Sequence, residues 1–178
     1  MKKILLCLFG ILLFTGCSCT NTTMVSSPTK KVEEFLGKYQ NMDTEVLTQL
    51  DLIVSEDTTM SDEEKSTYRG LMEKQYQNLA YKIKNEEISD DKAVVEVEIE
   101  VLDYASSIRK SKKYYDEHLD EFKEDDTYTK YKLEQMGKVD DKVKYDMSFH
   151  LTKSEDGTWS LDSISDIDRQ KIHGLYEK

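Results

Sequence analysis

Apolar and polar positions divide the N-terminal half of the chain into helical segments. After an apolar run at the N-terminus, three segments repeat apolar residues every three or four positions, the spacing of one helix face. Ser27 or Thr29 caps the first and Asp43 precedes the second, while Ser61-Asp62-Glu63-Glu64 opens the third as a capping box. The expected buried positions are Val32, Phe35, Leu36 and Tyr39, then Val46, Leu47 and Leu50, then Tyr68, Leu71, Met72 and Gln75 or Tyr76.

Beyond the third helix the period of the pattern changes to two, which is typical of half-buried strands. Glu155-Asp156-Gly157 predicts a hairpin turn, and Asp90-Asp91 predicts another. The positions expected to face the core are Leu79, Tyr81 and Ile83, then Val95, Val97, Ile99 and Val101, then Val143, Tyr145, Met147, Phe149 and Leu151, then Trp159 and Leu161. We therefore expect a curved antiparallel sheet of about four strands, mostly in sequential order.

A long helical insertion is expected between the second and third strands, from about 106 to 136, with a break near Asp125-Asp126. Ile108, Tyr115, Leu119 and Phe122 form its apolar stripe, which Tyr128, Tyr131 and Met136 continue. Residues 109–113 contain four bases, whereas residues 116–126 contain seven acids. Such an arrangement is either a docking surface with two signs of charge or a solvated helix face. A closing helix from Ser165 to His173 ends before Gly174.

The length and the composition fit a single domain with an N-terminal extension. The chain has 178 residues, with 25 basic and 36 acidic side chains and a net charge of −11. This acidic balance argues against a nucleic-acid partner, because phosphate contacts need clustered Lys and Arg. The pattern predicts an α+β domain over residues 30–178, in which N-terminal helices pack on the sheet.

The extreme N-terminus has the pattern of a targeting segment. Lys2 and Lys3 precede an apolar run over residues 4–14, which is too short for a membrane span but has the length of a signal-peptide core. Thr15-Gly16-Cys17 follows and resembles a lipobox, the motif at which bacterial lipoproteins are cleaved and lipidated. The alternative is an ordinary cleaved signal peptide. We expect residues 1–16 to be the signal peptide and Cys17 to be the lipid attachment site.

Processing at Cys17 would leave the domain on a tether outside the cytoplasm. Residues 17–29 are mostly polar and uncharged, and they contain the single Pro of the chain. Removal of residues 1–16 takes away two Lys and no acid, so the net charge falls from −11 to −13. Anionic lipids repel such a domain. We expect a lipid-anchored protein on the extracytoplasmic face of the cell membrane.

A search for catalytic or metal-binding patterns gives mainly negative results. The three histidines, His118, His150 and His173, lie far apart in the sequence, and no Gly-rich phosphate loop or G-x-S-x-G elbow is present. The acid pairs do not match a calcium loop and are expected in turns. Glu96, Glu98 and Glu100 form a row whose expected use is cross-strand pairing with Lys82, Lys84 and Lys144. We predict no metal, no cofactor and no catalytic residue.

The order of elements resembles a group of Gram-positive bacterial lipoproteins. The residues that carry this resemblance are the Lys142–Thr152 strand, Gly157-Thr158-Trp159-Ser160-Leu161-Asp162 and the closing Ile172-His173-Gly174-Leu175-Tyr176. Domains of this group resemble the nuclear-transport-factor-2-like, or cystatin-like, fold. The resemblance implies a curved sheet around a conical cavity, in proteins that are mainly binding or scaffold modules. No acid/base set of the enzyme members matches this sequence, and the long insertion departs from the simplest form of the fold.

Two functions remain open at this point. The favoured one is a non-enzymatic binding module at the cell envelope, for another protein or a small ligand. The alternative is a small hydrolase or isomerase that uses a carboxylate and a Tyr inside the cavity, which a desolvated carboxylate there would favour. Tyr81, Tyr145 and Trp159 either line such a cavity or fill it as core. A filled cavity would favour binding through the outer surface.

Overall fold

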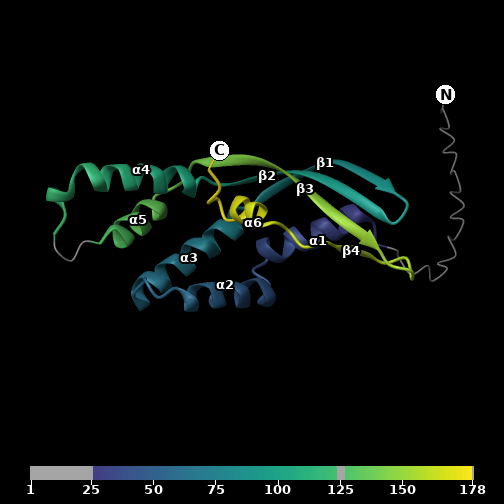
Figure 1. Ribbon diagram of the computed structural model, residues 1–178, viewed down its shortest axis with the longest axis horizontal. Helices are drawn as coiled ribbons and strands as arrows, with labels where there is room; N and C mark the ends of the chain where they lie inside the picture. The colour runs from purple at the N-terminus through teal and green to yellow at the C-terminus, as the bar shows by residue number, and fades with distance from the viewer. Residues whose placement is uncertain (1–25, 124–126, 178) are drawn as a thin grey trace, which may run out of the picture.

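The computed structural model describes residues 26–123 and 127–177 and has an α+β architecture (Figure 1). The predicted signal peptide, Cys17 and the predicted tether as far as Val25 lie outside these residues, and so does the expected break near Asp125-Asp126. In chain order the described elements are α1 (Pro28–Gln40), α2 (Thr44–Glu56), α3 (Asp62–Asn78), β1 (Ala80–Ser89), β2 (Lys92–Leu102), α4 (Tyr104–Glu117), the 3-10 turn η1 (Leu119–Glu121), α5 (Tyr128–Gly137), β3 (Lys142–Lys153), β4 (Trp159–Leu161) and α6 (Asp166–Ile172). The expected succession of helices, strand pair, helical insertion, hairpin and closing helix is confirmed.

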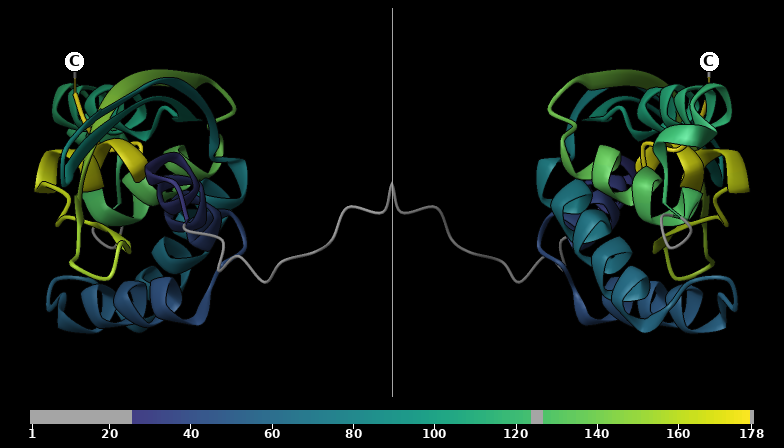
Figure 2. Two further views of the ribbon diagram at one scale, coloured as in Figure 1. Left: turned by 90° about the vertical axis from the view of Figure 1, so that its right-hand side faces the viewer. Right: turned by 90° about the vertical axis from the view of Figure 1, so that its left-hand side faces the viewer.

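The four described strands form one antiparallel sheet in the order β1-β2-β3-β4, which is open and does not close into a barrel. Its centre is the pair β2–β3, which runs without interruption from Lys92 opposite Thr152 to Leu102 opposite Lys142. β4 is short and pairs with the end of β3. Figure 2 shows the strands arching over the helices. The predicted sequential, curved sheet is confirmed.

β1 is longer than its alternating pattern predicts, because a bulge changes the phase of the strand. The register shifts between Ile83 and Asn85. Beyond the shift Glu86 lies opposite the buried Val95, so its carboxylate is on the core side of the sheet edge. There it accepts hydrogen bonds from the backbone N and Oγ1 of Thr29, at 2.8 and 2.6 Å. The bulge therefore places an acid against the first turn of α1, where the helix dipole favours negative charge.

The N-terminal helices begin at the expected caps. Ser27 caps α1 and Asp43 caps α2, while Ser61 and Glu64 form the capping box of α3. Pro28 stands in the first turn of α1, where the absent N–H costs no hydrogen bond. The helix therefore starts two residues before the domain start expected at residue 30.

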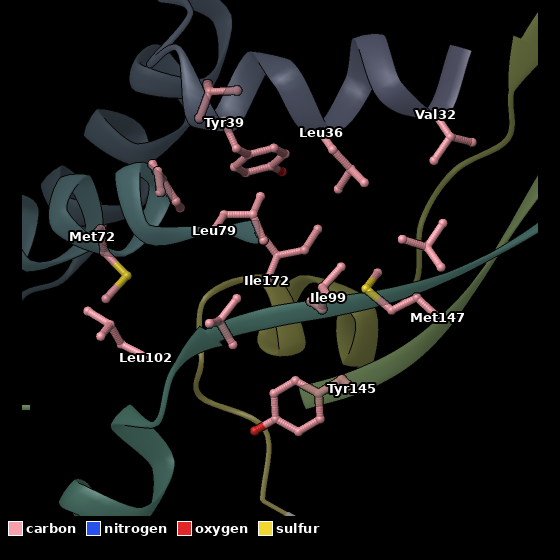
Figure 3. Close-up of a cluster of buried hydrophobic side chains, with 14 of the residues drawn as sticks. Val32, Leu36, Tyr39, Met72, Leu79, Ile99, Leu102, Tyr145, Met147 and Ile172 are labelled. Carbon is pink, nitrogen blue, oxygen red and sulfur yellow. The ribbon is translucent and has the colours of Figure 1, made fainter. Parts of the chain in front are cut away.

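The core lies between α1, α3, α6 and the concave face of the sheet (Figure 3). Edge-to-face ring pairs connect its layers, with centroids 5.8 Å apart for Phe35 and Phe149 and 5.1 Å apart for Tyr39 and Tyr76. The fully buried side chains include Val32, Leu36, Met72, Val95, Val97, Ile99, Phe149, Leu151 and Ile172. With the exception of Met72 and Ile172, these residues come from the periodic stripes of the first helix and of the two central strands.

The opposite face of the sheet is polar and has part of the expected cross-strand ion pairs. Lys84 and Lys144 are used, Lys142 takes part in place of the expected Lys82, and among the described residues Glu96 has no ion pair. Lys84 Nζ and Lys144 Nζ lie 2.9 and 3.0 Å from the two carboxylate oxygens of Glu98. Hydrogen bonds from these two ammonium groups lower the pKa of Glu98 to about 2. Lys142 and Lys144 approach Glu100 at 3.6 and 3.7 Å. Glu98 and Glu100 are therefore members of an ion-pair network rather than free carboxylates.

The closing helix joins three parts of the chain at a buried junction. α6 is capped by Ser165 at its start and by His173 at its end, and the next residue, Gly174, adopts a φ of +68° as the predicted left-handed position. The carbonyl of Gly174 accepts a hydrogen bond from the backbone N of Ala105 at 2.8 Å. Next to it lies the fully buried amide of Gln75, which makes two hydrogen bonds to the backbone of Leu102. Gln75 Nε2 donates to the carbonyl oxygen of Leu102 at 3.1 Å, and the backbone N of Leu102 donates to Gln75 Oε1 at 2.9 Å.

His173 makes stability depend on pH. Its Nε2 lies 3.2 Å from the hydroxyl of Tyr76, and burial lowers its pKa from 6.5 to about 4, with the charge of Arg169 as a smaller cause. Because the folded-state pKa is below the unfolded-state value, the unfolded chain binds the proton more readily. The neutral, buried His173 therefore makes its full contribution to the free energy of unfolding above pH 6.5. This contribution is lost as the pH falls toward 4, and the loss amounts to up to about 3 kcal/mol.

The variant His173→Gln tests this expectation, since glutamine keeps a polar group near Tyr76 but does not titrate. Urea unfolding of wild type and variant between about pH 7.5 and 4.5 should show a smaller loss of stability for the variant. His150→Gln is the matched control, because His150 is exposed on β3. Equal acid sensitivity of His173→Gln and wild type would contradict the assignment.

Candidate functional site

The helical insertion forms an arm, defined here as α4, η1 and α5, at one end of the molecule (Figure 1). α1 begins at the other end of the long axis. The base of the arm is fixed by buried contacts: the hydroxyl of Tyr104 donates to the carbonyl of Leu71 at 3.0 Å, and the backbone N of Asp103 donates to the carbonyl of Asp141 at 2.9 Å. Lys74 on α3 donates to the carbonyl of Val139 at 3.2 Å. The arm is therefore attached firmly at its root.

Aromatic rings hold the two helices of the arm together. The contacts join Tyr115 to Phe122 at 4.6 Å, Phe122 to Tyr131 at 5.0 Å and Tyr115 to Tyr128 at 5.5 Å between centroids. Tyr114 adds a ring 5.8 Å from Tyr131. The predicted stripe is confirmed in these members, but its member Leu119 is 60 % exposed. α4 ends at Glu117, so Leu119 belongs to η1 and leaves the helical phase of the stripe.

The charges of α4 are mostly matched by acids on the arm or at the C-terminus. Lys112 and Lys113 pair with the acids four residues later, Asp116 and Glu117, at 2.5 and 3.9 Å. Arg109 lies 3.9 Å from Glu177. These exposed pairs are typical of a solvated helix face and contribute little to stability. They favour a solvated helix face over a docking surface with two signs of charge as the interpretation of these charged residues.

A groove runs between α4 and α5 at the base of the arm. It has a volume of about 340 Å³ and is lined by Asp103, Ser106, Ser107, Lys110, Ser111, Tyr114, Tyr131, Gln135, Val139 and Asp141. Two of its polar groups are used internally: Asp103 Oδ1 accepts from Ser106 N at 3.0 Å, and Ser111 Oγ donates to the carbonyl of Ser107 at 2.7 Å. The hydroxyl of Tyr114 is used as well, since it donates to Glu121 at 2.6 Å. Lys110, Gln135 and Asp141 add further polar groups to the lining, which makes the groove a candidate for binding a small polar molecule.

The three rings considered either as cavity lining or as core belong to the core. Tyr145 and Trp159 are 3 % and 5 % exposed, and Tyr81 packs against the core in a partly buried position. The hydroxyl of Tyr145 donates to the carbonyl of Tyr176 at 2.7 Å, and burial raises its pKa to about 12. These rings fill the space that they were considered to line.

The described residues bring no metal-binding group together. Among residues 26–123 and 127–177, no three His, Cys, Asp or Glu side chains are placed to hold an ion. His118 stacks on Tyr114 with centroids 4.1 Å apart, His150 is exposed on β3, and His173 lies beside Tyr76. No helix in the described part of the chain is both long and apolar enough to span a membrane.

The groove residues share no pattern in the sequence that marks them as a site. Lys110 was one base of a charge run, and Tyr131 was one ring of an apolar stripe. Ser106, Gln135 and Asp141 carried no signal, because their proximity depends on how α5 returns along α4. A short-range pattern does not contain that information.

Comparison with known proteins gives one structural likeness. No protein-family model and no curated protein matches the chain. A solved chain from Bacillus subtilis subsp. subtilis str. 168, described as a "putative lipoprotein (ycdA)", superposes with a TM-score of 0.43 and 20% sequence identity. The match covers 82% of this chain and 47% of that one, so this chain spans about half the length of the solved structure.

Proposed function

We propose that this protein is a lipid-anchored lipoprotein on the extracytoplasmic face of a Gram-positive cell membrane, where it acts as a non-enzymatic binding module. The observation that carries the proposal is the N-terminal pattern of Lys2-Lys3, an apolar run over residues 4–14 and Thr15-Gly16-Cys17. The arched sheet on N-terminal helices further supports a domain of the nuclear-transport-factor-2-like, or cystatin-like, type.

The physical basis of the anchor is the transfer of acyl chains into the bilayer. Each buried CH₂ contributes about 0.8 kcal/mol, and stable attachment takes more than one chain. A diacylglyceryl group on Cys17 supplies two chains. Cys7 leaves with the signal peptide in this scheme, so Cys19 has no intramolecular disulfide partner.

The filled interior supports binding through the surface. Tyr145 and Trp159 occupy the inside of the sheet. The hydrolase or isomerase alternative needs a desolvated carboxylate in a cavity. The buried polar side chains in the described part of the chain are Gln75 and Ser111, of which neither is an acid. This favours the binding module over the enzyme.

Replacement of the lipid attachment site tests the anchor. Cys17→Ala expressed in a Gram-positive host should leave the protein unprocessed or release it from the washed membrane fraction, because the acceptor thiol is missing. The measurement is the distribution between membrane and soluble fractions together with the intact mass. Cys19→Ala is the matched control and should remain membrane-bound and lipidated. The proposal would be overturned if the Cys17→Ala protein were cleaved like the wild type and remained in the membrane fraction to the same extent.

A further inference from the structure

The groove between α4 and α5 has the size of a small-molecule site. Its volume of about 340 Å³ falls at the lower end of the roughly 300–1,000 Å³ typical of ligand pockets. Both walls are helices whose roots are tied to the body through Tyr104 and Lys74. The walls therefore keep their spacing without a ligand, which reduces the entropy that binding has to overcome.

The polar groups of the groove include both donors and acceptors. The ammonium of Lys110 donates, the amide of Gln135 does both, and the carboxylates of Asp103 and Asp141 accept. With one positive and two negative groups, in a chain of net charge −11, the groove is unfavourable for an anion such as a phosphate. A ligand hydroxyl both donates and accepts, so a polyhydroxylated neutral molecule matches this set.

Lys110 differs from the other bases of α4. Arg109, Lys112 and Lys113 each have a carboxylate partner. Within residues 26–123 and 127–177, Lys110 makes no ion pair, and it is the member of this run that lines the groove. Its three N–H donors are available to a ligand.

The aromatic side of the groove is held in place. The ring centroids of Tyr131 and Phe122 lie 5.0 Å apart. The hydroxyl of Tyr114 donates to Glu121 at 2.6 Å, and the ring of His118 stacks on the ring of Tyr114. Tyr114 is still 39 % exposed. The ring of Tyr131 lies 5.8 Å from that of Tyr114, with the ring planes 29° apart. The groove therefore offers only the remaining exposed surface of these two rings beside its polar groups, a combination that suits the C–H and hydroxyl groups of a sugar ring.

We propose that this groove binds a neutral saccharide of one or two sugar units, with Lys110 and Gln135 as hydrogen-bonding residues and Tyr114 and Tyr131 as the apolar wall. The inference rests on the proposed function, since an envelope binding module meets extracytoplasmic glycans. The arm lies at the opposite end of the molecule from the start of α1, to which the anchored segment connects (Figure 1).

Isothermal titration of the full-length lipidated protein in detergent micelles tests the inference. The probes are cellobiose and the disaccharide of N-acetylglucosamine, with glucose 6-phosphate as an anionic probe. At least one neutral disaccharide should bind with a Kd below about 1 mM. Lys110→Met, which keeps the aliphatic stem, should weaken that binding roughly tenfold, because it removes a charge-assisted hydrogen bond. Lys113→Met on the same helix should change it by less than about twofold, since its charge is a surface ion pair.

Three results would overturn the site: no heat from either disaccharide at about 10 mM, stronger binding of glucose 6-phosphate, or equal loss in the two lysine variants. Co-sedimentation with insoluble cellulose and chitin separates the sources of the ligand. Retention indicates a polymer chain, and binding of the disaccharides without retention indicates a soluble sugar.

Failure of the site and failure of the proposed function are distinguishable. The mass of the disaccharide recovered after the titration shows whether it has been cleaved. Cleavage would be consistent with the proposed binding site but would contradict a non-enzymatic function. The fractionation of Cys17→Ala reports on the anchor independently of any sugar.

Discussion

Gly174→Ala should destabilise the protein by about 3 kcal/mol or more, the sum of two separate costs. Gly174 has a φ of +68°, which is unfavourable for any residue with a Cβ. A Cβ at this position would also lie 2.1 Å from Gln75 Nε2 and 2.2 Å from Leu102 O. Neither atom can move freely, because the two residues are hydrogen-bonded to each other in a buried site. With total stabilities of roughly 5–15 kcal/mol, a large part of the stability would be lost.

Gly70→Ala is the matched control for this substitution. Gly70 lies inside α3, and a Cβ added there would have open space around it, with nothing within 4 Å. Alanine should therefore stabilise the helix by roughly 0.5–1 kcal/mol. Urea unfolding followed by circular dichroism measures both variants. A Gly174→Ala protein as stable as the wild type would show that the junction is looser than described.

Gln75→Leu should cost about 2–4 kcal/mol, although leucine is apolar and similar in size. The amide of Gln75 is fully buried and satisfies both backbone groups of Leu102 at the end of β2. Leucine would leave that N–H and that carbonyl buried without partners, which is more costly than the loss of a surface hydrogen bond. The expected result is a lower urea midpoint with an unchanged dependence on urea.

Gln77→Leu is the appropriate comparison, because Gln77 is on the same helix but exposed. Its free energy of unfolding should stay within about 0.5 kcal/mol of the wild type. Hydrogen exchange adds a local measurement: the amide of Leu102 should exchange faster in Gln75→Leu than in Gln77→Leu. Equal protection of this amide in both variants would argue against the proposed role of Gln75.

Local signals in the sequence were sufficient to predict most of the elements. The capping box at Ser61, the cap at Asp43 and the left-handed Gly174 are each determined by side chains within a few residues. The alternation in β2 and β3 defined the core face of the sheet, and the turns predicted at Asp90-Asp91 and Glu155-Asp156-Gly157 indicated neighbouring strands. β1 was predicted too short, because the bulge at Lys84 interrupts the period of two.

Contacts between distant segments could not be predicted in the same way. Gln75 was expected to be buried as one of two alternatives, but its partner Leu102 is 27 residues away and supplies backbone groups that no pattern marks. The groove has the same origin, since Lys110 and Gln135 meet through the packing of α4 on α5. Charge runs were informative about solvent exposure, yet they did not reveal which base of α4 lines the groove.

The continuous β2–β3 pairing has a consequence for the folding pathway. Leu102 and Lys142 are neighbours in the sheet although residues 103–141 separate them, so their pairing closes a long loop. Loop-closure entropy rises with the number of flexible residues, and contacts of large sequence separation slow folding. An arm whose helices associate early, through rings close in sequence such as Tyr115 on α4 and Tyr128 on α5, would shorten the effective loop. In that pathway the insertion would be the nucleus that brings the two central strands together.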